Sequence, residues 1–335
     1  MVKIADVARH AQVSPSTVSY VLSGKRSISE ATRLRVAESI RELGYRPHAG
    51  ARALASNRSN VLALVAPLRH GIHVPVVMQF AVSVVITARR FDHDVLLLTQ
   101  EEGEEGLRRV ADSALADALV VMDVELHDAR IPLLRSLERP SVLIGLPADT
   151  TGLTCIDLDF TAAGATCVDH LVGLGHASVA LIGSPPEVYA RETGFARRTE
   201  EGFTAAASRH GIAATVHPCE PTATAARELV DRLLREQPDL TAVVVHNEPI
   251  VEAVVDAFQR AGRGVPADVS VVAICPDNLA ERATVPLTSV AIPAEEVGER
   301  AVELLMSKLD GHDVPDLTLL VPRLTSRAST AGTAP

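Results

Sequence analysis

Hydrophobic and polar positions along the chain follow two different patterns, and the change comes near residue 60. Within residues 1–60, apolar side chains recur every three or four positions over three short stretches, which predicts three amphipathic helices. From residue 61 onward, uninterrupted apolar runs of four or five residues alternate with helical stretches. Short apolar runs separated by helices are typical of parallel sheets covered on both faces. The pattern predicts an all-α N-terminal domain followed by an α/β core.

The first two predicted helices are separated by a short break at residues 12–13. One face of the first helix holds four apolar residues, Ile4, Val7, Ala8 and Ala11. Ser14 is a good N-cap for the second helix, and Pro15 fits its first position, where a missing N–H costs nothing. Three residues of the second helix are expected to face inward: Val18, Val21 and Leu22. Four should point outward: Pro15, Ser16, Ser19 and Tyr20.

The third predicted helix covers residues 30–43 and completes a small module. Ser29 can cap its start, and Gly44 and Pro47 end it. Its inward residues are expected to be Leu34, Ala37, Ile40 and Leu43. Three short helices with a tight turn between the first two predict a helix-turn-helix module. The alternative is a generic three-helix bundle with a solvated basic face.

Charge is divided unevenly along the chain, whose formal net charge is -10. Residues 1–60 hold ten Lys and Arg against four Asp and Glu, a net charge of +6. The remaining residues hold twenty-two against thirty-eight, a net charge of -16. A basic N-terminal piece on an acidic body suggests that only the first piece meets a polyanion.

The core sequence has two halves, and each shows the same alternation of strands and helices. Its first half has apolar runs at 61–65, 94–98, 118–122 and 141–144, and helices at 76–91, 106–113 and 129–137. Its second half has apolar runs at 178–182, 241–245 and 269–273, and helices at 162–174, 202–210, 223–236 and 249–261. A split near residue 160 therefore predicts two doubly wound lobes. A ligand is expected in the crevice at the carboxyl ends of the strands.

Several classes of protein are excluded by what the sequence lacks. There is no run of about eighteen apolar residues and no signal peptide at the start, so we expect a soluble, cytoplasmic protein. The four cysteines are scattered and predict neither a zinc site nor disulfides. No P-loop, Gly-x-Ser-x-Gly or His-Glu-x-x-His is present, and Asp92-His93-Asp94 is expected to be a solvated turn. We expect no enzyme, cofactor or metal; a small-molecule binding protein or enzyme with an incidental basic N-terminus is the alternative.

One series of residues is both long and specific: Ile4-Ala5-Asp6-Val7-Ala8, Val13-Ser14-Pro15-Ser16-Thr17-Val18-Ser19, Ser29, Thr32-Arg33, Val36 and Leu43-Gly44-Tyr45-Arg46-Pro47. It resembles the lactose-repressor (LacI) family of bacterial transcriptional regulators, and the resemblance extends to about Arg327. The resemblance implies an all-α helix-turn-helix DNA-binding domain (1–46), a hinge helix (47–59) and an α/β periplasmic-binding-protein-like core of two doubly wound parallel-sheet lobes (60–327). Lobe 1 would comprise 60–160 and 291–320, lobe 2 would comprise 161–290 and 321–327, and 328–335 would be a tail.

The resemblance implies DNA contacts from the second and third helices. Three residues would read base edges: Pro15, Ser16 and Tyr20. Five would contact phosphates: Lys3, Thr17, Ser19, Ser29 and Thr32. Hydroxyls and N–H groups at a helix N-terminus suit phosphate oxygens and fix register without reading sequence. Tyr20 stands where many family members have Arg, and Lys3 stands where Thr or Ser often caps the first helix.

Residues 48–56 form only a weak helix by their own sequence, because the stretch is short and contains Gly50. In the family this segment is the hinge helix, which folds when it pairs with its dimer mate in the minor groove. The resemblance places Leu54 at the position of the apolar wedge that unstacks a base step. The hinge contacts would come from His48, Ala51, Arg52 and Leu54.

Effector contacts are expected from polar residues near the ends of strands. The candidates are His73, Asp123, Arg191, Arg198, Asn247, Glu248, Cys275 and Asp277. Asn247-Glu248 resembles the Asn-Asp pair that contacts sugars or purines in the family. Cys275 replaces the family's usual hydroxyl-binding carboxylate, and Thr199 stands where an effector-binding Arg is usual. A sugar is the effector that the resemblance implies, although several sugar-binding groups are replaced.

The sequence therefore predicts a sequence-specific transcriptional regulator, in the first place a repressor. It would bind a palindromic DNA operator as a homodimer, and a small-molecule effector between the lobes would change lobe closure and move the two hinge segments. Its expected partners are double-stranded operator DNA, the effector and a second copy of the chain.

Overall fold

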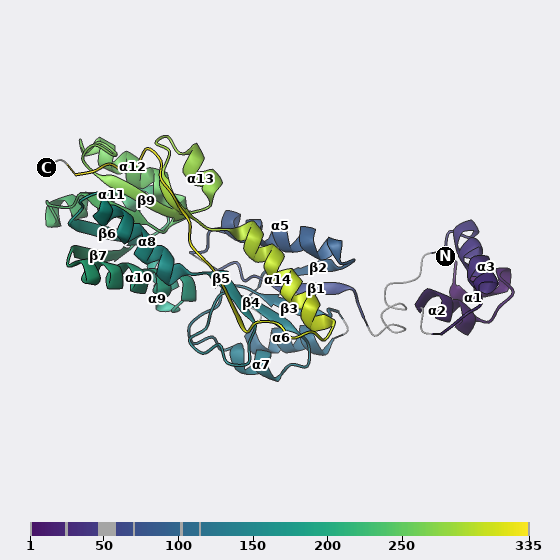
Figure 1. The fold of residues 1–335 in the computed structure, drawn as a ribbon. Coiled ribbons are helices and arrows are strands. Elements are labelled where there is room, and N and C mark those ends of the chain that lie inside the picture. Colours follow the sequence, from purple (N-terminus) through teal and green to yellow (C-terminus); the bar gives the residue numbers. More distant parts are fainter. Residues whose placement is uncertain are drawn as a thin grey trace.

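The computed structural model describes residues 2–23, 26–45, 58–69, 71–100, 103–113 and 115–333 of the chain. These residues form an N-terminal helical module and a core of two α/β lobes (Figure 1). The fold class predicted from the hydrophobic pattern is therefore confirmed.

Three short helices make up the N-terminal module: α1 (Ile4–His10), α2 (Pro15–Ser23) and α3 (Glu30–Glu42). Serine side chains cap α2 and α3. Ser14 Oγ accepts the N–H of Thr17 at 3.1 Å, and Ser29 Oγ accepts the N–H of Thr32 at 3.4 Å. Each bond satisfies a backbone donor that the first turn of a helix leaves unpaired. The buried core of the module comprises Val7, Ala8, Ala11, Val18, Val36 and Tyr45.

The inward face of α3 differs from the expected one. Leu34 is 65% exposed and Ala37 is exposed as well, whereas Val36 and Ser39 are buried. Ser39 can lie inside because its hydroxyl donates to a carbonyl of the preceding turn at 2.8 Å and lies 3.1 Å from Nδ1 of His10. A pattern that counts only apolar residues misses a buried serine, so it rotates the predicted face. On α2 the inward stripe is also narrower than expected, because Leu22 is exposed.

Lobe 1 is built on a six-stranded parallel sheet with strand order β11-β5-β4-β3-β1-β2. The strands are β1 (Val61–Val65), β2 (Asp94–Leu98), β3 (Ala118–Val121), β4 (Ser141–Ile144), β5 (Cys155–Leu158) and β11 (Leu317–Leu320). Its helices are α5 (Val74–Arg90), α6 (Gly103–Asp112), α7 (Ile131–Ser136) and α14 (Ala294–Leu309). The pair α5 and α14 covers one face of the sheet, and α6 and α7 cover the other (Figure 1). Successive residues of β1, such as Leu62 and Ala63, point to opposite faces and accordingly belong to different apolar clusters.

Lobe 2 has a six-stranded sheet with strand order β12-β10-β9-β8-β6-β7, in which only the short β12 pairs antiparallel. The strands are β6 (Ser178–Gly183), β7 (Ala213–Pro218), β8 (Ala242–Val245), β9 (Ser270–Cys275), β10 (Thr288–Ala291) and β12 (Leu324–Thr325). Its helical elements are α8 (Phe160–Gly173), α9 (Pro186–Ala190), α10 (Gly194–His210), α11 (Ala223–Glu236), η1 (Glu248–Ile250), α12 (Val251–Arg260) and α13 (Asp277–Arg282). Helices α8 and α10 pack together on one face, and α11 and α12 cover the other.

The chain passes between the lobes three times: from β5 to α8, from β10 to α14, and from β11 to β12. Five of the described strands have no counterpart among the apolar runs of the sequence: β5, β7, β10, β11 and β12. β5 is interrupted by the carboxyl of Asp157, and β7 is an edge strand whose residues are exposed or half-buried. Neither therefore presents the uniform apolar run by which buried strands are recognised.

Residues 328–333 are not the separate tail that the sequence predicts. Ser329 is fully buried; its Oγ donates to the carbonyl of Val271 at 2.6 Å and accepts the N–H of Thr288 at 2.8 Å. The N–H of Ala331 donates to Ser270 Oγ at 3.0 Å. This segment packs into lobe 2 because its small polar residues complete hydrogen bonds of β9 and β10. Hydrophobicity alone gives no signal for such a role.

In the part of the chain that the structure describes, no helix is long and apolar enough to cross a membrane, and no group of His, Cys, Asp and Glu could hold a metal ion. The turn at residues 92–94 is less solvated than the sequence predicts. His93 is buried, with Nδ1 2.7 Å from the carbonyl oxygen of Phe91 and Nε2 3.7 Å from the carboxylate of Asp117.

Replacing Ser329 tests whether the C-terminal segment is part of lobe 2. Ser329→Ala should lower the free energy of unfolding by about 2 kcal/mol, because it leaves the Thr288 N–H and the Val271 carbonyl buried without their side-chain partner. Urea denaturation followed by circular dichroism measures the change. Ser326→Ala, at an exposed position three residues earlier, is the matched control and should have no effect. Equal stability of the two variants would contradict the structural role of Ser329.

Candidate DNA-binding surface and interlobe cavity

The exposed face of α2 carries the residues that the sequence predicts for base reading. Pro15 and Ser16 are exposed at the start of the helix, and Tyr20 is partly exposed one turn further on. Val18 on the opposite face is fully buried. Its burial fixes the rotation of α2, so that its polar residues face outward.

A cluster of hydroxyl groups surrounds the N-terminus of α2. Ser14 Oγ lies 2.8 Å from Ser16 Oγ and 2.9 Å from Thr17 Oγ1. A second pair occurs at the start of α3, where Ser29 Oγ donates to Thr32 Oγ1 at 2.9 Å. Hydroxyls and free N–H groups at two helix N-termini form a surface suited to phosphate oxygens.

Two basic residues stand beside this surface. The guanidinium carbon of Arg26 lies 5.3 Å from the centroid of the Tyr20 ring, in cation–π range. Arg26 therefore places a positive charge next to the recognition helix, although sequence reasoning gave it no role. Lys3 is exposed, and its backbone N–H donates to the Asp6 carboxylate at 2.9 Å, which holds the start of α1 without the Lys3 side chain. The predicted hinge residues His48, Ala51, Arg52 and Leu54 lie outside the described residues.

A cavity that is partly open to solvent lies between the lobes. Residues that follow β1, β3, β4, β6 and β8 line it, so the carboxyl ends of both sheets meet there. Most of its lining is apolar. Its aliphatic residues include Ile72, Val76, Val77, Met122, Val124, Ile144 and Ile292. Its polar residues are His73, Asp123, Asp157, Ser184, His246, Asn247 and Glu248.

Aromatic rings form one wall of the cavity. Phe160 and His246 are stacked with ring centroids 5.5 Å apart, and Phe195 meets His246 edge-on, also at 5.5 Å. Burial lowers the pKa of His246 to about 4, so its imidazole is neutral at physiological pH. Its Nδ1 atom is buried and has no hydrogen-bond partner among the described residues. A buried polar atom left unpaired at a cavity wall is available to a ligand.

Three carboxyl groups enter the cavity from different elements. Burial raises the pKa of Asp157 to about 7, partly opposed by the hydrogen bond that it accepts from the N–H of Leu158. Burial also raises the pKa of Glu248 to about 7. Asp123 has a raised pKa for the same reason, although Arg69, Arg191 and Arg130 oppose the shift. Asp123 is thus surrounded by cations, whereas Asp157 and Glu248 have no ion-pair partner within the described part of the chain.

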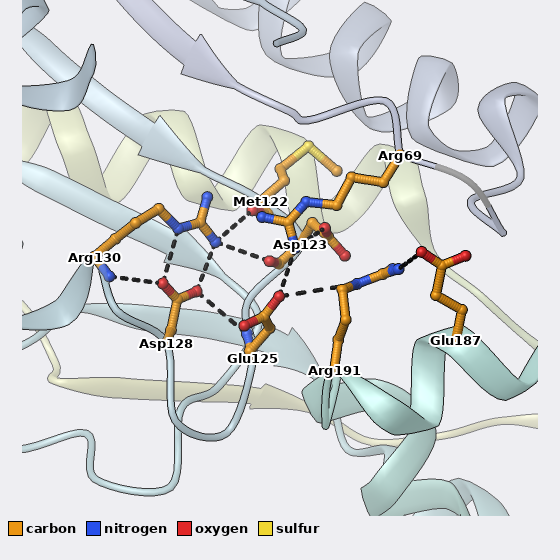
Figure 2. A network of polar contacts seen from close by, with 8 residues as sticks. All are labelled: Arg69, Met122, Asp123, Glu125, Asp128, Arg130, Glu187 and Arg191. Carbon is orange, nitrogen blue, oxygen red and sulfur yellow. Dashed lines mark hydrogen bonds and ion pairs between the residues drawn. The ribbon is translucent and has the colours of Figure 1, made fainter. Parts of the chain in front are cut away.

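A network of ion pairs joins the two lobes beside the cavity (Figure 2). Arg69 Nη1 of lobe 1 lies 2.5 Å from Glu125 Oε1 and 3.6 Å from Asp123 Oδ2. From lobe 2, Arg191 Nε lies 3.8 Å from the same Glu125 oxygen, and its Nη1 lies 3.6 Å from Glu187 Oε1. Glu125 is therefore shared by a guanidinium from each lobe.

Arg130 and Asp128 hold the loop that presents this network. Arg130 Nη2 donates to Asp128 Oδ2 at 2.6 Å and to the carbonyls of Met122 and Asp123 at 3.2 and 2.8 Å (Figure 2). The pair is buried, and the hydrogen bonds and charge of Arg130 outweigh desolvation and lower the pKa of Asp128. The loop after β3 is thereby fixed in place.

Backbone hydrogen bonds close the lobes at the same place. Gly194 N–H donates to the carbonyl of Val124 at 2.9 Å, and Leu126 N–H donates to the carbonyl of Glu192 at 2.8 Å. Residues 124–126 of lobe 1 and 192–194 of lobe 2 therefore pair like two short strands. Arg198 adds a clamp, because its guanidinium donates to the carbonyls of Leu146 and Pro147 at 2.8 and 3.1 Å.

The structure brings four of the eight predicted effector residues to the cavity: His73, Asp123, Asn247 and Glu248. The other four do not line it. Arg191 and Arg198 make the interlobe contacts described above. Cys275 is fully buried at the end of β9, where burial raises the pKa of its thiol to about 12, and Asp277 Oδ1 lies 2.5 Å from Arg327 Nη2. Cys275 and Asp277 were predicted from their position at a strand end, and the two arginines from their place in the loop and helix start before Gly202. Neither kind of position shows which way a side chain points.

Asn247 lines the cavity but is largely committed to the fold. Its Nδ2 donates to the carbonyl of Gly183 at 3.0 Å and to that of Cys219 at 2.8 Å. Both amide hydrogens are used, so only its carbonyl oxygen remains for a ligand. Sequence reasoning missed Asp157 and His246. The usable signal for Asp157 was a carboxylate within an otherwise apolar run, Cys155 to Leu158.

Known proteins match this chain in its N-terminal module, in its core and along its whole length. Residues 3–48 match bacterial regulatory proteins, lacI family, and residues 168–330 match the periplasmic binding protein-like domain. The chain is 31% identical to the HTH-type transcriptional regulator AglR of Rhizobium meliloti (strain 1021), over 100% of this chain and 95% of that protein. It is 30% identical to the HTH-type transcriptional regulator DegA of Bacillus subtilis (strain 168), over 98% of each.

Solved structures share the fold. The Lac repressor dimer bound to operator and the anti-inducer ONPF has a TM-score of 0.82 at 24% identity, covering 98% of this chain and 99% of that chain. The CelR–cellobiose complex has a TM-score of 0.68 at 24% identity, covering 98% and 100%. At these identities the likeness establishes the fold alone. The two curated relatives named above are transcriptional regulators rather than enzymes. With its N-terminal match and a 31% identical regulator along its whole length, the chain belongs to the lacI family of bacterial regulatory proteins and is a DNA-binding transcriptional regulator.

Proposed function

We propose that this regulator is a homodimeric repressor that binds a palindromic operator, and that a small molecule in the interlobe cavity sets its affinity for DNA. One observation carries the proposal: a single chain joins an exposed helix-turn-helix surface to two lobes that close around a largely apolar cavity. Two similar structures support it, since one is the Lac repressor dimer bound to operator and the other is the CelR–cellobiose complex.

On DNA, α2 would enter the major groove with Pro15, Ser16 and Tyr20 toward the base edges. Pro15 and Ser16 cannot make a bidentate base contact, so readout there depends on apolar contact and DNA shape. Phosphate contacts would come from Lys3, Thr17, Ser19, Ser29 and Thr32, with Arg26 added by the structure. The hinge residues His48, Ala51 and Arg52 would follow the minor groove, with Leu54 inserted as a wedge.

An exposed apolar face on lobe 1 supports the homodimer. Helix α5 packs on α14 with one side, and its other side exposes Val82, Val85 and Ile86. Phe91 and Leu97, at and after the end of the helix, are exposed as well. Apolar residues gathered on one helix face favour association with another surface. A second copy of the same helix would bury this face symmetrically.

Coupling to DNA would pass through the residues that enter lobe 1. The Asp117 carboxylate accepts the backbone N–H groups of Ser59 and Asn60 at 2.6 and 2.8 Å, and the Ser59 hydroxyl at 2.9 Å. Residues 59–60 are thereby fixed to the sheet of lobe 1. A change in the position of this lobe would therefore reach the hinge directly.

The buried carboxyls support a ligand-binding role for the cavity. An ionised carboxylate taken out of water without an ion-pair partner destabilises the fold; Asp157 is buried in this way, and Glu248 is half-buried. Groups that cost stability are retained where function needs them. A bound effector that contacts both lobes would shift the balance between open and closed lobes by its differential affinity for the two.

Ser16→Asp should abolish specific operator binding while leaving the module folded. An acidic side chain in the first turn of α2 stabilises the helix by its dipole but repels DNA phosphates. Band-shift titrations on genomic fragments at two salt concentrations measure the affinity, and binding by the parent should weaken steeply with salt. Ala37→Asp adds the same charge on an exposed site of α3 and should have a much smaller effect.

Leu54→Ala tests the proposed wedge and should weaken specific operator binding in the same band-shift titration. The control is Leu115→Ala, at an exposed position of lobe 1. Undiminished specific binding by Leu54→Ala would refute the wedge.

Ile86→Glu should dissociate the dimer. Burying a carboxylate in the apolar face of α5 is expected to raise the dimer dissociation constant by about a hundredfold, or about 2.7 kcal/mol. Sedimentation velocity at micromolar concentration reports the oligomeric state, and operator affinity should fall with it. Val321→Glu is the control, since Val321 is 80% exposed outside this face. A dimer that survives Ile86→Glu would place the interface elsewhere.

Asp157→Asn should stabilise the ligand-free protein above pH 7 by on the order of 2 kcal/mol. The unfolded Asp ionises near pH 4, whereas burial holds the folded pKa at about 7. The folded parent therefore keeps a proton that the unfolded chain loses, and its stability falls as the pH rises from about 4 to 7.

The amide does not titrate, so the advantage of the variant should vanish near pH 4. His246 has the opposite slope, since its pKa is lowered to about 4, but it is the same in both proteins and cancels. Urea unfolding at pH 5, 6 and 8 measures the difference, with exposed Asp239→Asn as control. A variant less stable than the parent at pH 8 would show that the Asp157 carboxylate is stabilised by the fold.

A further inference from the structure

The cavity between the lobes offers more hydrogen-bond acceptors than donors: a neutral imidazole carries only one N–H, and His73 and His246 are the imidazoles in its described lining. None of its described lining residues is Lys or Arg, and the Asn247 amide hydrogens are both used within lobe 2. The Ser184 hydroxyl is directed to the carbonyl of His246 at 3.4 Å. A polyol needs both donors and acceptors from its site, because each hydroxyl is both. This lining therefore suits a ligand that donates more than it accepts.

Two of the acceptors are carboxyls that come from opposite lobes. Asp157 belongs to β5 of lobe 1 and Glu248 to η1 of lobe 2. The charge of Arg198 lowers the pKa of Asp157 in part, but its guanidinium donates to the carbonyls of Leu146 and Pro147 and forms no ion pair with Asp157. Glu248 forms no ion pair with any described residue; its carboxyl is stabilised only by its own backbone N–H. Neither carboxyl has the direct ion-pair partner that buried carboxylates in proteins normally have.

The remaining walls suit a cation on an apolar frame. Phe160 and Phe195 stand beside His246, and Phe80 lines the cavity from α5. Aromatic faces attract a cation by their quadrupole, most strongly when both are desolvated. His246 is only 2% exposed. Its unpaired Nδ1 accepts a hydrogen bond in the tautomer that carries the proton on Nε2.

We infer that the effector is a small organic ammonium: a protonated amine, carried on an aromatic or aliphatic frame, that lies between Asp157 and Glu248. An ammonium has three donors and no acceptor, which complements the lining. It supplies the direct ion-pair partner that both carboxyls lack, and it connects the two lobes. This inference rests on the proposed effector role of the cavity and names the chemistry of the molecule that fills it.

The test uses the full-length protein and matched probes. The probes are 2-phenylethylamine, its uncharged analogue 2-phenylethanol, the aliphatic diamine cadaverine, and cellobiose. Isothermal titration at pH 8 should give an affinity for at least one amine that is tenfold or more above that for 2-phenylethanol and cellobiose. Glu248→Gln and Asp157→Asn should each weaken amine binding at least tenfold. Glu236→Gln, exposed at the end of α11, is the matched control and should bind like the parent.

A second readout separates charge recognition from a general effect of the substitutions. Amine affinity should rise about tenfold for each carboxyl between pH 6 and pH 8, because both carboxyls must lose a proton to pair with the cation. His246, whose pKa is lowered by burial to about 4, stays neutral over this range. The other titratable groups of the lining are His73, whose pKa burial lowers, and Asp123, whose pKa burial raises; both are the same in the parent and in the two carboxyl variants. The ammonium itself stays protonated, so a flat pH profile contradicts the inference.

Other outcomes overturn the ammonium inference but leave the proposed repressor function intact. Binding of cellobiose or 2-phenylethanol as tight as that of the amines does so, and so does failure of every amine to bind, or unchanged amine binding by both carboxyl variants. Operator binding without ligand is measured in parallel by band shift. Loss of all specific DNA binding by the parent refutes the proposed repressor, whereas intact DNA binding with a preference for sugar refutes only the ammonium.

Discussion

The backbone pairing between residues 124–126 and residues 192–194 determines how the two lobes meet. Parallel strands in both sheets end at the same crevice, so closing the lobes at this point brings their polar strand-end residues together in a partly enclosed space. The displaced pKa values of Asp157, Glu248 and His246 all follow from that enclosure. The chemistry of the cavity is therefore a product of lobe closure and not of any one lobe.

The same contacts are few enough to be reversible. The lobes are held together here by two backbone hydrogen bonds, the Arg198 clamp and the ion pairs around Glu125. Each contact replaces a contact with water, so its net contribution to closure is about 1 kcal/mol. Three chain crossings keep the lobes attached whatever this edge does. A molecule that contacts both lobes can then decide the position of the edge, since its binding free energy is of comparable or larger size.

Sequence reasoning reached the architecture because the signals for it are local. Serine caps, helical periodicity and uniform apolar runs each act within a few residues, and they gave the module and both lobes. The return of the chain to lobe 1 after residue 291 came instead from the family resemblance. Sequence reasoning failed where a polar group is satisfied by a distant partner. Ser39 inside the module and Ser329 inside lobe 2 depend on such partners, and Arg198 lies in the interlobe clamp instead of the cavity for the same reason. Asp157 escaped notice because the carboxyl that makes it useful also breaks the strand pattern.

The anchor at Asp117 gives strand β1 a mechanical role. Ser59 and Asn60, held by Asp117, come directly before the strand, and Ala66 and Pro67, which line the cavity, come directly after it. Five residues of extended chain span about 16 Å, and a strand buried in the middle of a sheet is stiff along its length. The cavity lining and the residues that lead back toward the helix-turn-helix module thus lie at opposite ends of strand β1. A displacement of the strand at its cavity end therefore moves Ser59 and Asn60 at its other end.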